Sequence, residues 1–232
     1  MTQAHPYTSR PRAEKFSYAC HRCLACCNNK IIQINPYEVA RLARKLGLST
    51  SEFRDAWTAD GAGTTLKQTA SGACAFLGDG GCTVHSDRPL VCRLYPLGRH
   101  VARDGSERFS HLEGHARSAG VKGRDGTIAA YLDNQGAADF MTAADEYFQW
   151  LCAAHDALAA ADQPVDDSET ATSCGDPEIT VHLLDMDTAI ARHCAAEAID
   201  EPQGIEDRKR LHLTLLYRAL NPQKELHHDH AY

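Results

Sequence analysis

Cys20-His21-Arg22-Cys23-Leu24-Ala25-Cys26-Cys27 is the stretch on which the interpretation of this chain depends. It places four thiols within eight residues, which is too dense for an ordinary strand or helix. Loops of this length let neighbouring sulfurs turn toward one point, and metals gather thiolate ligands at this separation. The side chains of the adjacent Cys26 and Cys27 diverge, so they are not expected to bind one tetrahedral ion together. The stretch predicts a loop around a metal centre that is polynuclear, is split into two sites or leaves one of these cysteines aside.

Three further cysteines extend this candidate site. Cys74 and Cys82 flank a glycine-rich turn, and Cys92 lies in a short segment between two prolines. A closed structural zinc site or a single cubane cluster takes about four ligands, so the chain offers more thiols than one simple site requires. The predicted metal ligands are Cys20, Cys23, Cys26, Cys27, Cys74, Cys82 and Cys92.

Histidines supply additional candidate ligands. His85 follows Cys82 by three residues and could complete a site. His111, Glu113 and His115 form a pattern that a strand would place on one face, and nitrogen and carboxylate ligands suit zinc or non-haem iron. For each histidine, a hydrogen-bonding or solvated role is the competing interpretation.

Two arginines near Cys92 are expected to lie next to the ligands and to offset their negative charge. Thiolate clusters carry net negative charge, which neighbouring guanidinium groups offset. Arg88 and Arg93 are predicted to have this role. A surface ion pair with one of the many carboxylates is the alternative.

The composition is that of a soluble globular protein. The 232 residues carry a formal net charge of -7, so the dense positive face of a nucleic-acid-coating protein is not expected. No apolar run approaches the ~20 residues of a membrane span, and neither nucleic acid nor membrane is an expected partner. Because residues 1–15 are also polar, we expect a cytoplasmic protein. In that reducing compartment the ten cysteines are expected to be metal ligands, reactive thiols or core residues rather than disulfides. Three of them stand alone and are not counted as ligands: Cys152, Cys174 and Cys194.

Capping and turn signals outline a loop-rich N-terminal half. Asn35-Pro36 begins a helix over residues 37–46 that Gly47 ends, and a Ser49/Glu52 capping box begins a second helix to Trp57. One helical turn is expected within residues 88–96. The expected strands cover residues 30–34 and 64–69, a hairpin of 74–77 with 82–84, and a hairpin of 97–101 with 107–112.

The C-terminal half has a helical pattern. Apolar residues recur at three- and four-residue spacing from residue 127 and through the alanine-rich run 137–161. An acidic, turn-rich connection over 162–177 leads to helices near 185–198 and 204–220. The predicted fold is mainly α with small β-hairpins, an α+β class in which helices pack a loop-rich cysteine metal knot. Residues 16–118 are predicted to form a metal-binding domain, and residues 127–220 a helical region packed on it.

These motifs resemble those of the YkgJ-type cysteine-cluster family, which is named for the pattern CxxCxxCC and described as a zinc- or iron-chelating domain. The family's opening motif appears at residues 20–27 and its central element as Cys74-Ala75-Phe76-Leu77. Its third element appears as Arg88-Pro89-Leu90-Val91-Cys92-Arg93-Leu94-Tyr95-Pro96. The resemblance covers residues 16–118 and implies that the chain chelates zinc or iron, with an iron-sulfur cluster as one form of iron.

The chain departs from the family pattern in one place. Many members have another cysteine in a Cys-Pro-Gly context after the third element, whereas residues 110–115 here contain none. His111 or His115 could replace that ligand. A related group, the flagellin lysine N-methylases, implies protein lysine methyl transfer, yet no Gly-x-Gly segment follows a clear strand in this sequence.

The leading hypothesis is a metal-binding protein that holds iron or zinc through its cysteine cluster and offers its C-terminal helices to a protein partner. The first alternative is a metal-dependent enzyme for redox chemistry or lysine methyl transfer, with His111, Glu113 and His115 at an open position. The second is a protein-interaction module that zinc only stabilises. The sequence assigns no catalytic residue.

Overall fold

The computed structural model describes residues 9–61, 63–113, 117–161 and 184–220. Within these residues the fold is an α+β mixture of helices and small antiparallel two-stranded sheets, which confirms the predicted class. The helices are α1 Pro36–Leu46, α2 Thr50–Trp57, α3 Leu90–Leu94, α4 Ile128–Asn134, α5 Ala138–Ala161, α7 Met186–Glu197 and α8 Ile205–Leu220, with 3-10 turns at Ala25–Cys27, Ala59–Gly61 and His85–Asp87. The strands are β1 Lys15–Ala19, β2 Leu77–Gly78, β3 Gly81–Cys82, β4 Leu97–Val101, β5 Glu107–His111 and β6 Val121–Thr127.

The first two helices begin and end where their capping residues predict. Asn35 accepts a hydrogen bond from the Glu38 backbone while Glu38 bonds back to the Asn35 N–H, and Ser49 and Glu52 form the same box at α2. Gly47 ends α1 in the left-handed conformation that glycine adopts without strain. The sequence prediction is confirmed for both helices.

Two predicted strands are wrong. Residues 30–34 and 64–69 contain only isolated bridges and no continuous ladder. Thr65 pairs with Gln33, Leu66 with Thr58, and Gln68 with Cys74, so the segment changes partner at almost every step. A β-like composition therefore produces extended chain here without a sheet.

One sheet was not expected from the sequence. Strands β1 and β6 pair antiparallel, although β6 contains charges and two glycines that disfavour a strand. These glycines allow close approach, because a Cβ at Gly123 would lie 2.6 Å from Ser17 Oγ and one at Gly126 would lie 3.2 Å from the Phe16 carbonyl oxygen. The sheet places Phe16 in the core.

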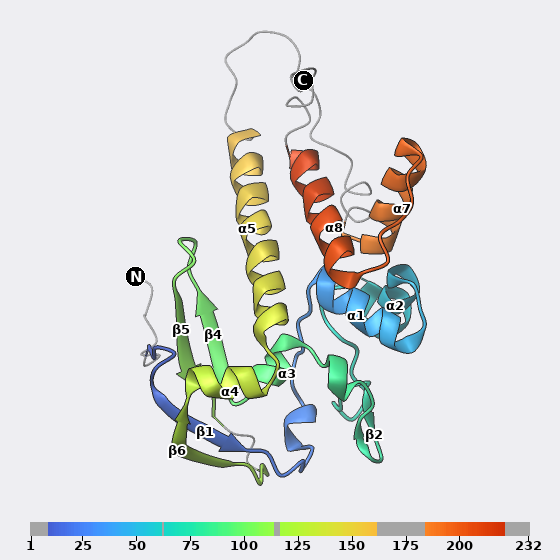
Figure 1. Ribbon diagram of the computed structural model, residues 1–232. Helices are drawn as coiled ribbons and strands as arrows, with labels where there is room; N and C mark the ends of the chain where they lie inside the picture. The colour runs from blue at the N-terminus through green and yellow to red at the C-terminus, as the bar shows by residue number, and fades with distance from the viewer. Residues whose placement is uncertain (1–8, 62, 114–116, 162–183, 221–232) are drawn as a thin grey trace.

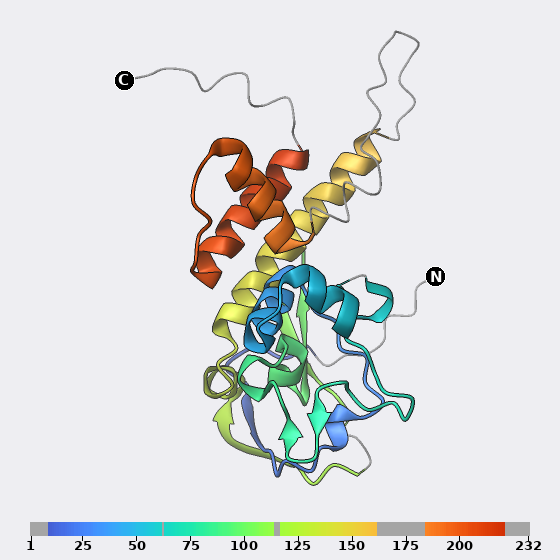
Figure 2. The same cartoon turned by 90° about the vertical axis from the view of Figure 1, so that its right-hand side faces the viewer.

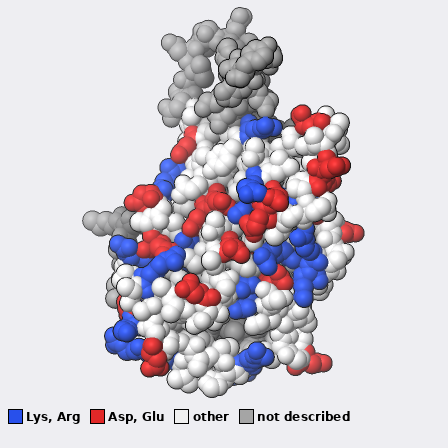
Figure 3. Space-filling view, in the orientation of Figure 1, with Lys and Arg blue, Asp and Glu red and all other residues white. Residues whose placement is uncertain are grey.

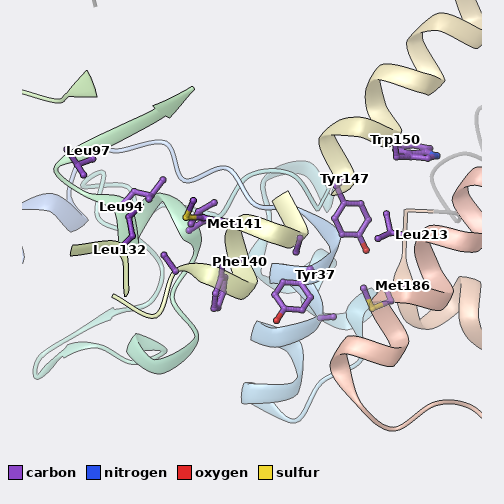
Figure 4. Close-up of a cluster of buried hydrophobic side chains, with 14 of the residues drawn as sticks. Tyr37, Leu94, Leu97, Leu132, Phe140, Met141, Tyr147, Trp150, Met186 and Leu213 are labelled. Atoms are coloured by element: carbon purple, nitrogen blue, oxygen red, sulfur yellow. The ribbon is translucent and has the colours of Figure 1, made fainter. Parts of the chain in front are cut away.

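Helices α5, α7 and α8 lie together at one end of the molecule, and the loop-rich segments with β1, β2 and β6 lie at the other (Figures 1 and 2). Helix α1 connects the two parts, because it contacts α5, α7 and α8 as well as α2. Tyr37 belongs to the larger core and packs edge-to-face on Phe140 at 5.7 Å (Figure 4). Val39 and Leu42 of the same helix belong to a second core, against which Cys74, Cys82 and Cys92 pack.

Two further features are the distribution of charge on the surface and the apolar length of the described helices. Basic and acidic side chains are intermixed on the face seen in Figure 3. Across the described residues, no helix combines the length and the apolar character that spanning a membrane requires.

Candidate metal centre

All seven cysteines proposed as ligands line one cavity of about 720 Å³. They come from separate parts of the chain. Four lie in the loop 20–27, Cys74 lies just before β2, Cys82 is in β3 and Cys92 is in α3. Cys20 and Cys23 are exposed, and the other five are partly buried. The structure therefore gathers thiols that are up to 72 positions apart in the sequence, from Cys20 to Cys92.

The loop that carries the first four cysteines is sharply folded. Arg22 and Leu24 have positive φ angles of 50° and 60°, and Asn29 has 54°. Left-handed backbone is unfavourable for residues with a Cβ and persists only where the surroundings impose it. The loop is tied to its neighbour by hydrogen bonds from Cys74 N to the Cys27 carbonyl (2.8 Å) and from Asn29 N to the Gly72 carbonyl (2.7 Å). Its shape is thus fixed by backbone contacts.

The predicted hairpin forms, but it is shorter than expected. Its ladder consists of Leu77 opposite Cys82 and Gly78 opposite Gly81. Gly81 has a φ of 111°, which suits glycine in a tight turn. The Leu77 N–H also donates to the Cys74 carbonyl at 2.9 Å, so the hairpin places both Cys74 and Cys82 in the lining of the cavity.

Buried charged groups hold the helix that carries Cys92. Glu38 accepts from the Leu90 N–H at 2.6 Å and fixes the start of α3 against α1. Arg93 donates to the carbonyls of Arg88 (3.0 Å), Gln135 (2.8 Å) and Ser86 (2.5 Å). Its guanidinium also lies 3.9 Å from the centre of the Phe140 ring.

The two arginines proposed to support the centre have different positions. Arg88 lines the cavity and donates to the His85 carbonyl and to Gln135 Oε1, each at 2.8 Å. Arg93 does not line it; this side chain binds the backbone behind Cys92.

The candidate histidines are also separated. His85 lines the cavity, whereas His111 packs on Phe16 with 5.2 Å between ring centres and lies outside it. Strand β5 ends at His111, so the strand pattern does not continue to Glu113, and His115 lies outside the described residues. Within the described ranges, no three histidine, cysteine or acidic side chains are arranged so that they could hold one metal ion as they stand.

A comparison with protein families gives a match over the segment that contains these thiols. Residues 19–113 match the model described as "CxxCxxCC: Putative zinc- or iron-chelating domain". Residues 19–113 are therefore similar to a CxxCxxCC domain. The match spans all seven cavity cysteines and ends before β6 and the C-terminal helices. Neither the curated proteins nor the solved structures gave a match.

The thiols of the CxxCxxCC domain differ in their tendency to ionise. A hydrogen bond from Cys27 lowers the pKa of Cys26, and the same pairing raises that of Cys27. The N–H groups of Ala119 and Ala25 lower the pKa of Cys23. Burial raises the pKa of Cys92 to about 12 and also raises that of Cys82. Because metals bind thiolates, binding at the buried thiols must release protons.

The lining of the cavity also contains residues that sequence reasoning did not single out. Polar side chains from outside the CxxCxxCC match line the cavity at Tyr18, Ser118, Tyr131, Asn134 and Gln135. Tyr18 and Ser118 share a 3.3 Å hydrogen bond, and Tyr131 donates to the Tyr95 carbonyl at 2.5 Å. Among these five residues, only Tyr18 is close in sequence to a candidate ligand, since it lies two residues before Cys20. The other four have no feature in the sequence that connects them with the cysteines.

Two of the three cysteines that were set aside lie on helices away from this cavity. Cys152 lies partly buried on α5 and Cys194 is buried on α7, and neither lines the cavity. Cys174 lies outside the described residues, as do the connection 162–177 and the histidine-rich segment 227–230.

Proposed function

We propose that this chain is a cytoplasmic metal-binding protein that holds zinc or iron through the cysteines of the cavity. One observation supports this proposal most strongly: seven cysteines from four segments line a single cavity. Packing alone does not account for such convergence, because buried cysteines that only fill a core have no need to face a common space. The family match supports metal binding in general.

The donor set fits the group that the family implies. Soft thiolate ligands select zinc, iron-sulfur clusters and Cu(I) over hard cations. The loop Cys20–Cys27 would supply ligands from one side, and Cys74, Cys82 and Cys92 from the other. A bound zinc ion would supply structural cross-linking, and an iron-sulfur cluster would add electron transfer. In either case the cysteines that bind must lose their protons.

Each of the two parts of the chain has a role in this proposal. We take residues 16–118 as the metal-binding domain and residues 127–220 as a helical region that packs on it through α1. Leu151 and Leu158 on α5 are 55% and 60% exposed, so this helix offers an apolar face to a protein partner.

The test is the metal content of cysteine variants purified anaerobically without a tag. Cys23→Ser and Cys92→Ser should lower zinc or iron bound per chain and lower stability, because each removes a thiolate donor. Cys152→Ser is the matched control and should keep the wild-type metal content. Equal metal content in all three variants would refute the assignment.

A further inference from the structure

The cavity is larger than a metal ion requires. Zinc bonds cysteine sulfur at about 2.3 Å, so one ion and its bonds occupy a small part of 720 Å³. The volume lies within the range of about 300–1,000 Å³ that is typical of small-molecule sites. The proposed metal centre therefore shares its cavity with space for a second occupant.

One side of that space is a polar wall, made of Tyr18, Arg88, Ser118, Tyr131, Asn134 and Gln135. Arg88 is held in place by its two 2.8 Å hydrogen bonds, to His85 O and Gln135 Oε1. These bonds engage two of the five N–H donors of a guanidinium group and fix its plane. The Gln135 bond also fixes which end of that amide faces Arg88.

The charges around the cavity favour an anion. Its cationic side chains are Arg22, Lys30 and Arg88, against one carboxylate, Asp79. Lys30 is oriented by the Tyr95 ring, whose centre lies 4.7 Å from Nζ. A zinc ion with about four thiolates would carry a net charge of about −2 and would offset the remaining positive charge of the lining, so the selection of an anion depends on the local geometry of Arg88. Arg88 remains suited to a ligand, because a fixed guanidinium can bind a carboxylate with two parallel hydrogen bonds.

The cavity also has an apolar side. The partly buried Leu24 and Tyr95 line it. Ile32, Leu66, Phe76 and Val84 lie beneath this surface and are only 4%, 4%, 2% and 1% exposed. These side chains come from the CxxCxxCC domain, whereas five of the six residues of the polar wall lie outside the family match. A ligand that uses both surfaces combines an apolar body with a charged end.

We infer that the cavity binds a small organic anion, with its anionic group on Arg88 and its apolar part beside Leu24 and Tyr95, next to the cysteines that hold the metal. This inference rests on the proposed function, since it gives the metal centre a ligand of its own. The CxxCxxCC domain supplies the metal-binding side, and β1, residues 117–120 and α4 supply residues that select the ligand.

The experiment is titration calorimetry of the zinc-loaded full chain with benzoate as the probe. Benzamide is the matched neutral compound, with the same ring and no charge. Benzoate should bind saturably and about tenfold or more tightly than benzamide. Arg88→Gln should weaken benzoate binding about tenfold or more, whereas Arg103→Gln, which removes an exposed arginine paired with Asp156, should leave it unchanged.

A second variant covers the case in which Arg88→Gln does not fold. Gln135→Glu places a carboxylate next to Arg88 and should weaken benzoate binding in the same direction. Absence of saturable benzoate binding, equal binding of benzamide, or wild-type affinity in folded Arg88 and Gln135 variants would overturn the inference. Zinc content is measured on the same samples, so a failure of metal binding, which concerns the proposed function, is distinguished from a failure of anion binding.

Discussion

Arg93 shows how one side chain organises the surroundings of a ligand without touching it. Its guanidinium binds four backbone carbonyls from two segments and covers the Phe140 ring, and Arg93 is only 5% exposed. Arginine suits this role because its donors form a rigid planar fork. The sequence pointed to Arg93 through its position beside Cys92, but it could not show that the side chain points away from the cavity.

Arg93→Lys should destabilise the metal-free protein by about 2–4 kcal/mol, because a lysine ammonium cannot reach the same carbonyls and leaves them buried without a donor. Urea unfolding under reducing conditions measures this free energy. The control Arg103→Lys changes an exposed ion pair and should cost less than about 1 kcal/mol. A wild-type unfolding midpoint for Arg93→Lys would contradict the role given to this side chain.

At the scale of elements, a carboxylate fixes helix α7 to α2. Asp185 caps α7 by accepting from the Thr188 N–H at 3.2 Å. It also accepts from Thr50 Oγ1 (2.5 Å) and Ser51 Oγ (2.7 Å) and pairs with Arg54 at 3.4 Å. Burial alone would raise the pKa of Asp185, but these hydrogen bonds lower it overall.

This lowered pKa predicts a pH-dependent contribution to stability. A carboxyl group whose pKa is lower in the folded state binds fewer protons there, so it stabilises the protein above the unfolded pKa of about 3.9. That contribution is lost as the pH falls through the folded-state pKa. Asp185→Asn should therefore destabilise the protein by about 2–3 kcal/mol at pH 7 and by less near pH 3.

Unfolding free energies of the wild type and Asp185→Asn at both pH values measure this difference. Asp133→Asn, at an exposed position of α4, makes the same charge change and should stay within about 0.5 kcal/mol of wild type. The account of α7 would be wrong if the Asp185→Asn difference were as large at pH 3 as at pH 7.

The elements that the sequence predicted well are those with local signals. Capping residues gave α1 and α2, and helical periodicity gave α5 and α8. The β1–β6 sheet had no such signal, because its glycines matter only through the partner strand that comes close to them: a Cβ at Gly120 would collide with the Tyr18 ring. Pairing between residues ~100 positions apart is set by tertiary packing, which local propensity does not encode.

At the scale of the whole molecule, a chain of polar contacts joins the metal-binding part to the C-terminal helices. Arg41 bonds to Asp87 (2.9 Å) and to the Tyr37 hydroxyl (3.0 Å), and this hydroxyl donates to Glu206 at 2.6 Å. Lys209 then pairs with Glu206 and with Glu146 of α5. Asp87 lies between Cys82 and Cys92, so the helices contact the segment that carries part of the candidate centre.

The sequence predicted one half of this centre and missed the other. Cysteine spacing is a strong signal, and the structure brings all seven of those thiols to one cavity. Tyr131, Asn134 and Gln135 are ordinary residues on or next to a helix, and the packing of α4 against β1 and β6 places them in the lining of the same cavity as the thiols. Side-chain type and spacing cannot report such a juxtaposition.

The central claim, that these cysteines share one metal-binding cavity, is tested most directly by alkylating the protein with iodoacetamide before and after metal removal and locating the modified residues by mass spectrometry. The account predicts that about four or more of the seven cavity cysteines are protected while metal is bound and react after chelation, because a metal-bound thiolate is a poor nucleophile. Cys152 should react to the same extent in both states. Equal modification of the cavity cysteines with and without metal would contradict the claim.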